Sequence, residues 1–405
     1  MILLKGGQTL CAGKLAPMDV LIEGSRIVRV ARDIDSPGAM LFDMHGCWVA
    51  PGAVDVHAHL REPGYAHKET IYSGTRSAAK GGITAVMSMP NLDPCPDSIE
   101  NLAVQTAIIA KDAAIRVYPY ASLTKAEKGE SLSDIRQLSK LVKAFSDDGR
   151  CVNNIRLLEQ AMRIVRECGG IIASHSEAAG YAGTEAESVA VERECELVCK
   201  TGCRYHFCHL STKKSFDAVR QAKSVGADIT CEVMPHHLFL DEEDVKGNPN
   251  AKMSPPLRSK EDREYTVQAL LDGTADMIAT DHAPHAAAEK AMGFDKAPNG
   301  IIGFETLLPL VYTGMVKTGY ADCKMMQKWV TESPASRFGI PYSIIEEGAV
   351  ADIVALDIAV ERVYKIDSTL SKSKNTPFSG SVLYGTPVLT LADGRIVYDT
   401  DRRMQ

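Results

Sequence analysis

Alternation between two kinds of segment dominates the sequence from residue 50 to residue 340 and limits the folds open to the chain. Short runs rich in β-branched residues, many of which end in a polar residue, alternate with longer stretches of helical periodicity. The predicted strands are residues 48–56, 83–89, 115–120, 141–145, 170–174, 205–208, 228–234 and 275–280. The predicted helices are residues 70–80, 98–112, 133–140, 155–168, 186–200, 213–225, 260–271 and 305–316. Eight such units in about 290 residues predict an α/β fold, a closed (β/α)8 barrel of the TIM type.

Both ends of the chain show a different pattern. Residues 1–46 and 348–405 contain short strands separated by Gly, Asp and Pro turns, as in VLTLADGRIVYD, and no helical period. Because the barrel lies between them in sequence, we expect the two ends to pair into one small β-sandwich beside it. The predicted domains are therefore residues 1–49 together with 341–405, and residues 50–340.

Composition argues against several classes of function. Lys and Arg total 45 and Asp and Glu total 52, for a net charge of −7, so nucleic acid and anionic membranes are not expected partners. Neither a signal-peptide pattern nor about 18 consecutive apolar residues occur, so we expect no membrane span and no secretion. The 11 cysteines lack paired C-x-x-C spacing, which is typical of buried thiols in a reducing compartment. We therefore expect a cytoplasmic protein.

Imidazoles and carboxylates gather where the predicted barrel strands end. His57 and His59 follow strand one and share a face because side chains alternate along a strand. His175 follows strand five, His209 follows strand six and Asp281 follows strand eight. The carboxyl ends of barrel strands meet on one face, so these side chains should converge there. Histidine with carboxylate is a ligand set suited to Zn²⁺ rather than to Ca²⁺ or Mg²⁺, which prefer oxygen alone.

A second ion would need an anionic ligand between the two histidine pairs. The end of strand four offers Asp147 and Asp148, and the residues alone leave the choice between them open. Lys143, whose carboxylated form would also bridge two metals, comes too early on that strand. The sequence therefore predicts one or two zinc ions held by this ring of side chains.

Six motifs spread over the chain carry a family resemblance. They are HAHLREPG at residues 57–64, MPN at 89–91, FSDDG at 145–149, CHLST at 208–212, PHHL at 235–238 and TDHAPH at 280–285. Together they resemble the dihydroorotases of the amidohydrolase superfamily, in the bacterial-type branch that has an aspartate on strand four instead of a carboxylated lysine. The H-x-H motif is shared across the superfamily, whereas H-x-H-x-R-x-P-G combined with D-H-A-P-H is specific to dihydroorotases.

The resemblance implies a role for each matching residue. It makes His57 and His59 ligands of one zinc ion and His175 and His209 ligands of a second, with Asp148 favoured over Asp147 as the bridge. Asp281 would be both a metal ligand and the catalytic proton shuttle. The residues expected to bind substrate are Arg61, Asn91, Ser254 and His285. His236 and His237 are expected to pack behind the site, because the ligand count is complete without them.

The implied reaction is the reversible interconversion of N-carbamoyl-L-aspartate and (S)-dihydroorotate in the biosynthesis of UMP. A divalent ion would acidify a water molecule and polarise the ring carbonyl, and Asp281 would act first as a general base and then as a general acid. The planar guanidinium of Arg61 would bind the ring carboxylate through two parallel hydrogen bonds.

Two other interpretations stay open at this point. Ser254 stands in the motif SPPLR, a form familiar from hydantoinases, so a hydantoinase or dihydropyrimidinase is the first alternative. A catalytically silent barrel that serves another enzyme of the pyrimidine pathway is the second, although no predicted ligand is missing. The resemblance also raises two protein partners, a second copy of the chain and aspartate transcarbamoylase, and the sequence leaves both open.

Overall fold

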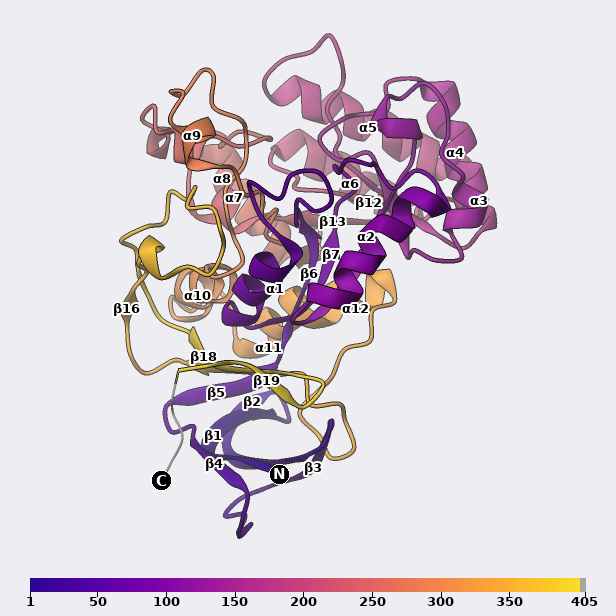
Figure 1. The fold of residues 1–405 in the computed structure, drawn as a ribbon. Helices are drawn as coiled ribbons and strands as arrows, with labels where there is room; N and C mark the ends of the chain where they lie inside the picture. The colour runs from indigo at the N-terminus through magenta and orange to yellow at the C-terminus, as the bar shows by residue number, and fades with distance from the viewer. Residues whose placement is uncertain (401–405) are drawn as a thin grey trace.

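The strands of the two chain ends form one sheet in the computed structural model, which describes residues 1–400. The sheet has the order β19-β18-β15-β5-β1-β2-β3, and β4 pairs with β1. Its strands are β1 (Ile2–Cys11), β2 (Lys14–Glu23), β3 (Arg26–Ala31), β4 (Met40–Asp43), β5 (Cys47–Pro51), β15 (Ile353–Asp357), β18 (Thr386–Ala392) and β19 (Arg395–Asp399). The N-terminal strands and the yellow C-terminal strands lie together at one end of the molecule in Figure 1. The two chain ends therefore pair through β5 and β15, as expected.

Nine short parallel strands form the barrel wall. They are β6 (Ala53–Ala58), β7 (Ile83–Ser88), β8 (Arg116–Pro119), β9 (Ala121–Ser122), β10 (Ala144–Ser146), β11 (Ile171–Ser174), β12 (Tyr205–Phe207), β13 (Ile229–Val233) and β14 (Met277–Ile278). The Tyr120 amide donates to the Ser88 carbonyl, so β8 and β9 are two parts of the third barrel strand. A bridge between Ala58 and His282 closes the wall between its first and last strands. The (β/α)8 prediction is confirmed.

The helices lie around this wall, and most of them cover its apolar outer side (Figure 1). They are α1 (Ile71–Lys80), α2 (Ile99–Asp112), α3 (Ile135–Leu138), α4 (Ile155–Glu167), α5 (Thr184–Thr201), α6 (Lys213–Ser224), α7 (Pro235–Phe239), α8 (Lys260–Leu271), α9 (Ala287–Lys290), α10 (Leu307–Val311), α11 (Cys323–Gln327) and α12 (Ser333–Phe338). Thr70, Thr212 and Ser259 begin three of them, and each side chain accepts a hydrogen bond from a main-chain amide of the first turn. None of the helices within residues 1–400 combines the length and the apolar character needed to cross a bilayer.

Several predicted element bounds are wrong, each for a local reason. The run 48–56 is two strands, because the chain passes from β5 in the terminal sheet to β6 in the barrel at Gly52, where a Cβ atom would lie 2.2 Å from the Thr84 side chain. Leu141 does not begin strand four; it is exposed in a turn after the single-turn helix α3. The predicted helix 305–316 is split into α10 and a π-helical turn, Tyr312–Val316. Within an apolar run the hydrophobic period does not change at such a break, so the sequence pattern does not reveal it.

Candidate active site

A cavity of about 390 Å³ lies at the carboxyl ends of the barrel strands. Nine of the predicted site residues line it: His59, Arg61, Asn91, Asp148, His175, His209, Ser254, Asp281 and His285. His57 is fully buried and contacts this ring of side chains. The structure thus brings all the predicted site residues together, while their chemical roles stay predictions.

The first predicted ligand group consists of His57, His59 and Asp281. The Asp281 Oδ1 atom lies 3.1 Å from His59 Nε2 and 3.5 Å from His57 Nε2. A tetrahedral zinc ion with bonds of about 2.0–2.1 Å separates its ligand atoms by about 3.3 Å, so this spacing fits such an ion. Asp281 has a φ of 48°, in the left-handed region that costs a residue with a side chain of order 1 kcal/mol or more. This strained turn at the end of the last barrel strand accompanies the inward position of the Asp281 carboxylate.

The second group consists of Asp148, His175 and His209. Asp148 Oδ1 lies 3.7 Å from His209 Nε2 and 4.0 Å from His175 Nδ1, and 3.4 Å from His57 Nε2 of the first group. The other oxygen, Oδ2, lies 3.4 Å from His59 Nε2. One carboxylate therefore reaches both histidine pairs, as a bridging ligand must.

The neighbouring Asp147 has a different environment. Its Oδ1 accepts hydrogen bonds from the amides of Leu123 and Thr124 at 2.8 and 3.0 Å, and its Oδ2 accepts from the Thr124 hydroxyl. Both oxygens of the Asp147 carboxylate thus accept hydrogen bonds from residues that directly follow β9. The geometry favours Asp148 as the bridge, and it places Lys143 elsewhere, with its ammonium donating to the Gly339 carbonyl.

Unpartnered polar atoms support a cation at this site. His57 Nε2 and Asp148 Oδ1 are buried without a hydrogen-bond partner among the described residues. Burial opposes the charge on Asp148, but the surrounding imidazoles, His57 first, hold its pKa well below the usual value. Three sets of three side chains share His57 and have ligand atoms within 4.8 Å of one another: His57 with His59 and Asp281, His57 with Asp148 and His209, and His57 with Cys208 and Glu232. In the first two sets the partners of His57 are histidine and aspartate side chains that line the cavity. The residues present therefore fit one or two divalent ions.

A buried glutamate that the sequence analysis missed lies behind His57. Glu232 Oε1 accepts a hydrogen bond from His57 Nδ1 at 2.6 Å, and its Oε2 lies 3.1 Å from His206 Nε2. Burial opposes the charge, yet the two imidazoles lower the pKa of Glu232 to about 2. Glu232 therefore orients His57 so that Nε2 faces the other predicted ligands, as carboxylates commonly do behind metal-binding histidines. The one signal in the sequence was a lone acidic residue inside the apolar strand β13.

We expect Glu232→Gln to weaken metal binding by about 10- to 100-fold, because an amide carries no charge and cannot accept equally from both imidazoles. Competition against a chelator of known affinity measures this change. Glu305→Gln is the matched control, since Glu305 is also buried but bonds to Ser77 and Thr369, away from the ligands. Equal metal affinity in the wild type and Glu232→Gln would remove this role.

Arg61 lines the opposite part of the cavity, and Lys68 lies behind it next to His285. Arg61 donates from Nε to the Pro284 carbonyl at 3.2 Å, and within residues 1–400 its guanidinium forms no ion pair. Lys68 Nζ lies 3.3 Å from His285 Nδ1, while His285 Nε2 donates to the Asn299 carbonyl at 2.7 Å. Burial first, and then Arg61 and Lys68, lower the pKa of His285 to about 3, so its ring is neutral. The sequence analysis missed Lys68.

Asn91 and Ser254 complete the wall. The Asn91 amide nitrogen donates to the Asp148 carbonyl at 2.5 Å and to Glu127 Oε1 at 3.1 Å. Asn91 would become a donor to a substrate only by exchanging one of these two bonds. Burial and the nearby Asp147 and Asp148 raise the pKa of Glu127 to about 8. Ser254 lies beside the carbonyl of Pro255, which is held by His237 Nε2 at 3.1 Å, so His237 supports the wall from behind, as expected.

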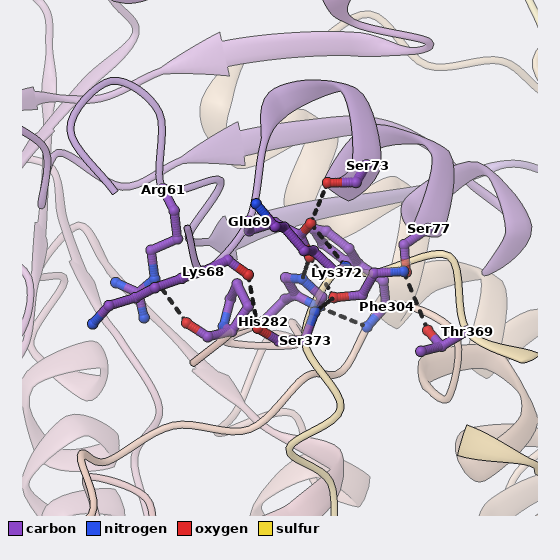
Figure 2. A network of polar contacts seen from close by, with 12 residues as sticks. Arg61, Lys68, Glu69, Ser73, Ser77, His282, Phe304, Thr369, Lys372 and Ser373 are labelled. Carbon is purple, nitrogen blue, oxygen red and sulfur yellow. Dashed lines mark hydrogen bonds and ion pairs between the residues drawn. The ribbon is translucent and has the colours of Figure 1, made fainter. Parts of the chain in front are cut away.

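His282 has a scaffolding position although it lies within the D-H-A-P-H motif. Its ring stacks on Phe304 at 3.8 Å, Nδ1 accepts from the Gly303 amide at 3.2 Å, and Nε2 lies 3.5 Å from Glu69. Figure 2 shows this network, in which Glu69 also accepts from Ser73 and from the Lys372 amide. Because the His282 carbonyl accepts from the His59 amide at 2.8 Å, the network holds together the two strand ends that carry His59 and Asp281.

The comparisons with known proteins agree with this geometry. Residues 46–186 match the family described as Dihydro-orotase-like. The chain is 46% identical over 421 aligned positions to the dihydroorotase of Listeria innocua, covering 98% of this chain and 99% of that one. It is 43% identical to the dihydroorotase of Staphylococcus epidermidis, with 99% and 100% covered. The chain belongs to the dihydroorotase family.

Solved structures with the same fold carry other names. An L-hydantoinase (dihydropyrimidinase) from Arthrobacter aurescens superposes with a TM-score of 0.89 at 24% identity, covering 100% of this chain and 97% of that one. A dihydropyrimidinase from Brevibacillus agri superposes with a TM-score of 0.88 at 22% identity, with 100% and 96% covered. At this identity the likeness concerns the fold alone. Membership of the dihydroorotase family rests on the much higher identity to the dihydroorotases, which argues against the hydantoinase interpretation.

Proposed function

We propose that this protein catalyses the reversible hydrolysis of (S)-dihydroorotate to N-carbamoyl-L-aspartate, the cyclic-amide step of UMP biosynthesis. The observation that carries the proposal is the guanidinium of Arg61, which lines the cavity without a carboxylate partner among residues 1–400. Dihydroorotate supplies that carboxylate, whereas hydantoin and dihydrouracil do not. Lys68 lies behind His285 on the same side of the cavity, where its ammonium is paired with Glu289 Oε1 at 3.0 Å.

The residues of the chain divide the reaction between two sides of the cavity. Arg61 binds the ring carboxylate, and Asn91, Ser254 and His285 orient the ring. A divalent ion held by the histidines and aspartates, when bound, would acidify water and polarise the amide carbonyl. Asp281 accepts the proton of the attacking water as the new carbon–oxygen bond forms. It then donates that proton to the ring nitrogen as the carbon–nitrogen bond breaks.

The test compares the purified protein on dihydroorotate, dihydrouracil and hydantoin, and in reverse on N-carbamoyl-aspartate. We expect efficient turnover of the first and last compounds and much slower turnover of dihydrouracil and hydantoin. Faster hydrolysis of hydantoin or dihydrouracil would replace this proposal by the hydantoinase alternative, and no turnover of any compound would favour the silent-barrel alternative.

We further propose that the ion is zinc and that two ions bind each subunit, since the His57, His59, His175, His209, Asp148 and Asp281 side chains exceed one tetrahedral shell. Elemental analysis of active protein should approach two equivalents. In Asp148→Asn we expect the content to fall to one equivalent or less, because the amide is a neutral ligand. Asp147→Asn is the control and should keep both ions while losing thermal stability. Full activity with one equivalent, unchanged by added zinc, would contradict this prediction.

The protein partners and the cellular location stay predictions. Self-association and association with aspartate transcarbamoylase follow only from the family resemblance, and size-exclusion chromatography with and without the transcarbamoylase tests them. A cytoplasmic location follows only from the sequence.

A further inference from the structure

The ammonium group of Lys290 is buried at the end of α9 and is used entirely on main-chain carbonyls. The residue is 6% exposed, and Nζ donates to the carbonyls of Pro298 at 2.8 Å, Pro249 at 2.9 Å and Lys252 at 3.3 Å. Among residues 1–400 it forms no ion pair, and it does not line the cavity. Burying a cation without a carboxylate partner costs free energy, so the positions of the three acceptor carbonyls indicate the role of Lys290.

Those three carbonyls belong to two loops that end at the cavity wall. Pro249 and Lys252 precede Ser254, and Pro298 precedes Asn299 and Gly300, all three of which line the cavity. One main-chain bond between the loops lies beside the ammonium, from the Gly300 amide to the Lys252 carbonyl at 3.0 Å. A second bond between the loops runs from Lys252 Nζ to the Asp295 carbonyl at 2.9 Å. Lys290 adds three bonds to these two, and so helps to hold together segments that are about 50 residues apart in the chain.

A displacement of these two loops would move residues on the substrate-binding side of the cavity. The Asn299 carbonyl, next to Pro298, accepts the hydrogen bond of His285 Nε2 at 2.7 Å and so sets the orientation of that ring. Ser254 lies two residues beyond Lys252 on the other loop. Releasing the ammonium would thus loosen Ser254, Asn299 and His285 together and leave the metal ligands in place.

We propose that Lys290 is a positioning residue that fixes the Ser254, Asn299 and His285 wall of the cavity for the ring of the substrate without contacting the substrate. This inference rests on the proposed function, because it assigns the wall to binding of the dihydroorotate ring.

The charge of Lys290 gives this role a pH dependence. Burial, and then the neighbouring Lys252, lower its pKa to about 8, while Glu289 acts in the opposite direction. Lys252 comes from the facing loop, Glu289 precedes Lys290 on α9, and His285 is neutral. Below about pH 8 the Lys290 ammonium has three protons and donates to all three carbonyls. Above it the neutral amine keeps two protons, so one carbonyl loses its donor and the wall loosens.

The experiment compares Lys290→Met with Lys296→Met, which removes an exposed lysine from the same loop. At pH 7 we expect Lys290→Met to raise KM for dihydroorotate about tenfold, because one or two charged hydrogen bonds are lost. The kcat of the variant should stay within about threefold of that of the wild type. The ratio of its KM to that of the wild type should fall towards one at pH 9.5. Lys296→Met should match the wild type throughout.

Hydrogen–deuterium exchange gives a readout that does not need a substrate. In Lys290→Met the amides of residues 245–254 and 291–300 should exchange faster, while those of α4 and α5 should not change. Unchanged KM and unchanged exchange would overturn the inference, as would a general loss of stability in which kcat falls and KM does not rise. If the wild type does not act on dihydroorotate, the proposed function fails and the assignment to ring binding fails with it. The exchange rates then decide whether Lys290 holds the loops.

Discussion

Replacement of Asp281 by Asn is expected to lower kcat for dihydroorotate hydrolysis by at least 10²- to 10⁴-fold, in both directions of the reaction. The amide has nearly the same shape as the carboxylate but cannot accept the proton of water or return it to the ring nitrogen. Its weaker coordination adds to the loss, because the Asp281 carboxylate lies 3.1 Å from His59 Nε2 and 3.5 Å from His57 Nε2. Steady-state kinetics at saturating zinc, with the metal content measured on the same sample, separates the two contributions.

The control lies on the same barrel strand at its opposite end. Asp276 precedes β14, and its Oδ2 accepts hydrogen bonds from the Cys231 amide at 2.8 Å and from Lys223 at 2.7 Å. Residues at the amino ends of barrel strands contribute to stability rather than to catalysis. Asp276→Asn should therefore lower the melting temperature and leave kcat nearly unchanged. Turnover close to wild type in Asp281→Asn would exclude the assigned proton transfer.

The second large effect concerns the choice of substrate. The wild type should prefer dihydroorotate over dihydrouracil by about 10²-fold or more in kcat/KM, because a buried cation that loses its carboxylate partner costs about 2–5 kcal/mol. The Ser254 hydroxyl contributes about one hydrogen bond, worth about 1 kcal/mol. The charge pair outweighs the hydrogen bond, so Arg61 and not Ser254 should determine selectivity.

Arg61→Met should remove most of that preference by weakening only the carboxylated substrate. Turnover of dihydrouracil by the same variant is the internal control for folding and metal binding, and Arg76→Met, on the exposed face of α1, is the control for loss of a positive charge. An equal loss on both substrates would show that Arg61 supports the fold of the site instead of binding the carboxylate.

Local features of the sequence were sufficient to predict the barrel and the residues that form the site. A period of two or 3.6 residues depends on nearest neighbours along the chain, so the eight units are visible without the structure. The polar residues that end strands one, four, five, six and eight converge because every parallel barrel brings those ends to one face. His57, His175, His209 and Asp281 could therefore be assigned to one site from their positions in the chain.

Tertiary structure alone decided which groups support that site. Glu232 reaches His57 across 175 residues of sequence, and Lys290 joins loops from two different βα units. The family resemblance already favoured Asp148 over Asp147 as the bridge, and the structure adds the physical reason, since main-chain amides occupy the Asp147 carboxylate. The break between β5 and β6 depended on a close approach of Gly52 to Thr84. Such contacts follow from how distant segments pack and not from any periodicity, so the sequence by itself determined the fold and the reacting groups, and packing determined how those groups are held.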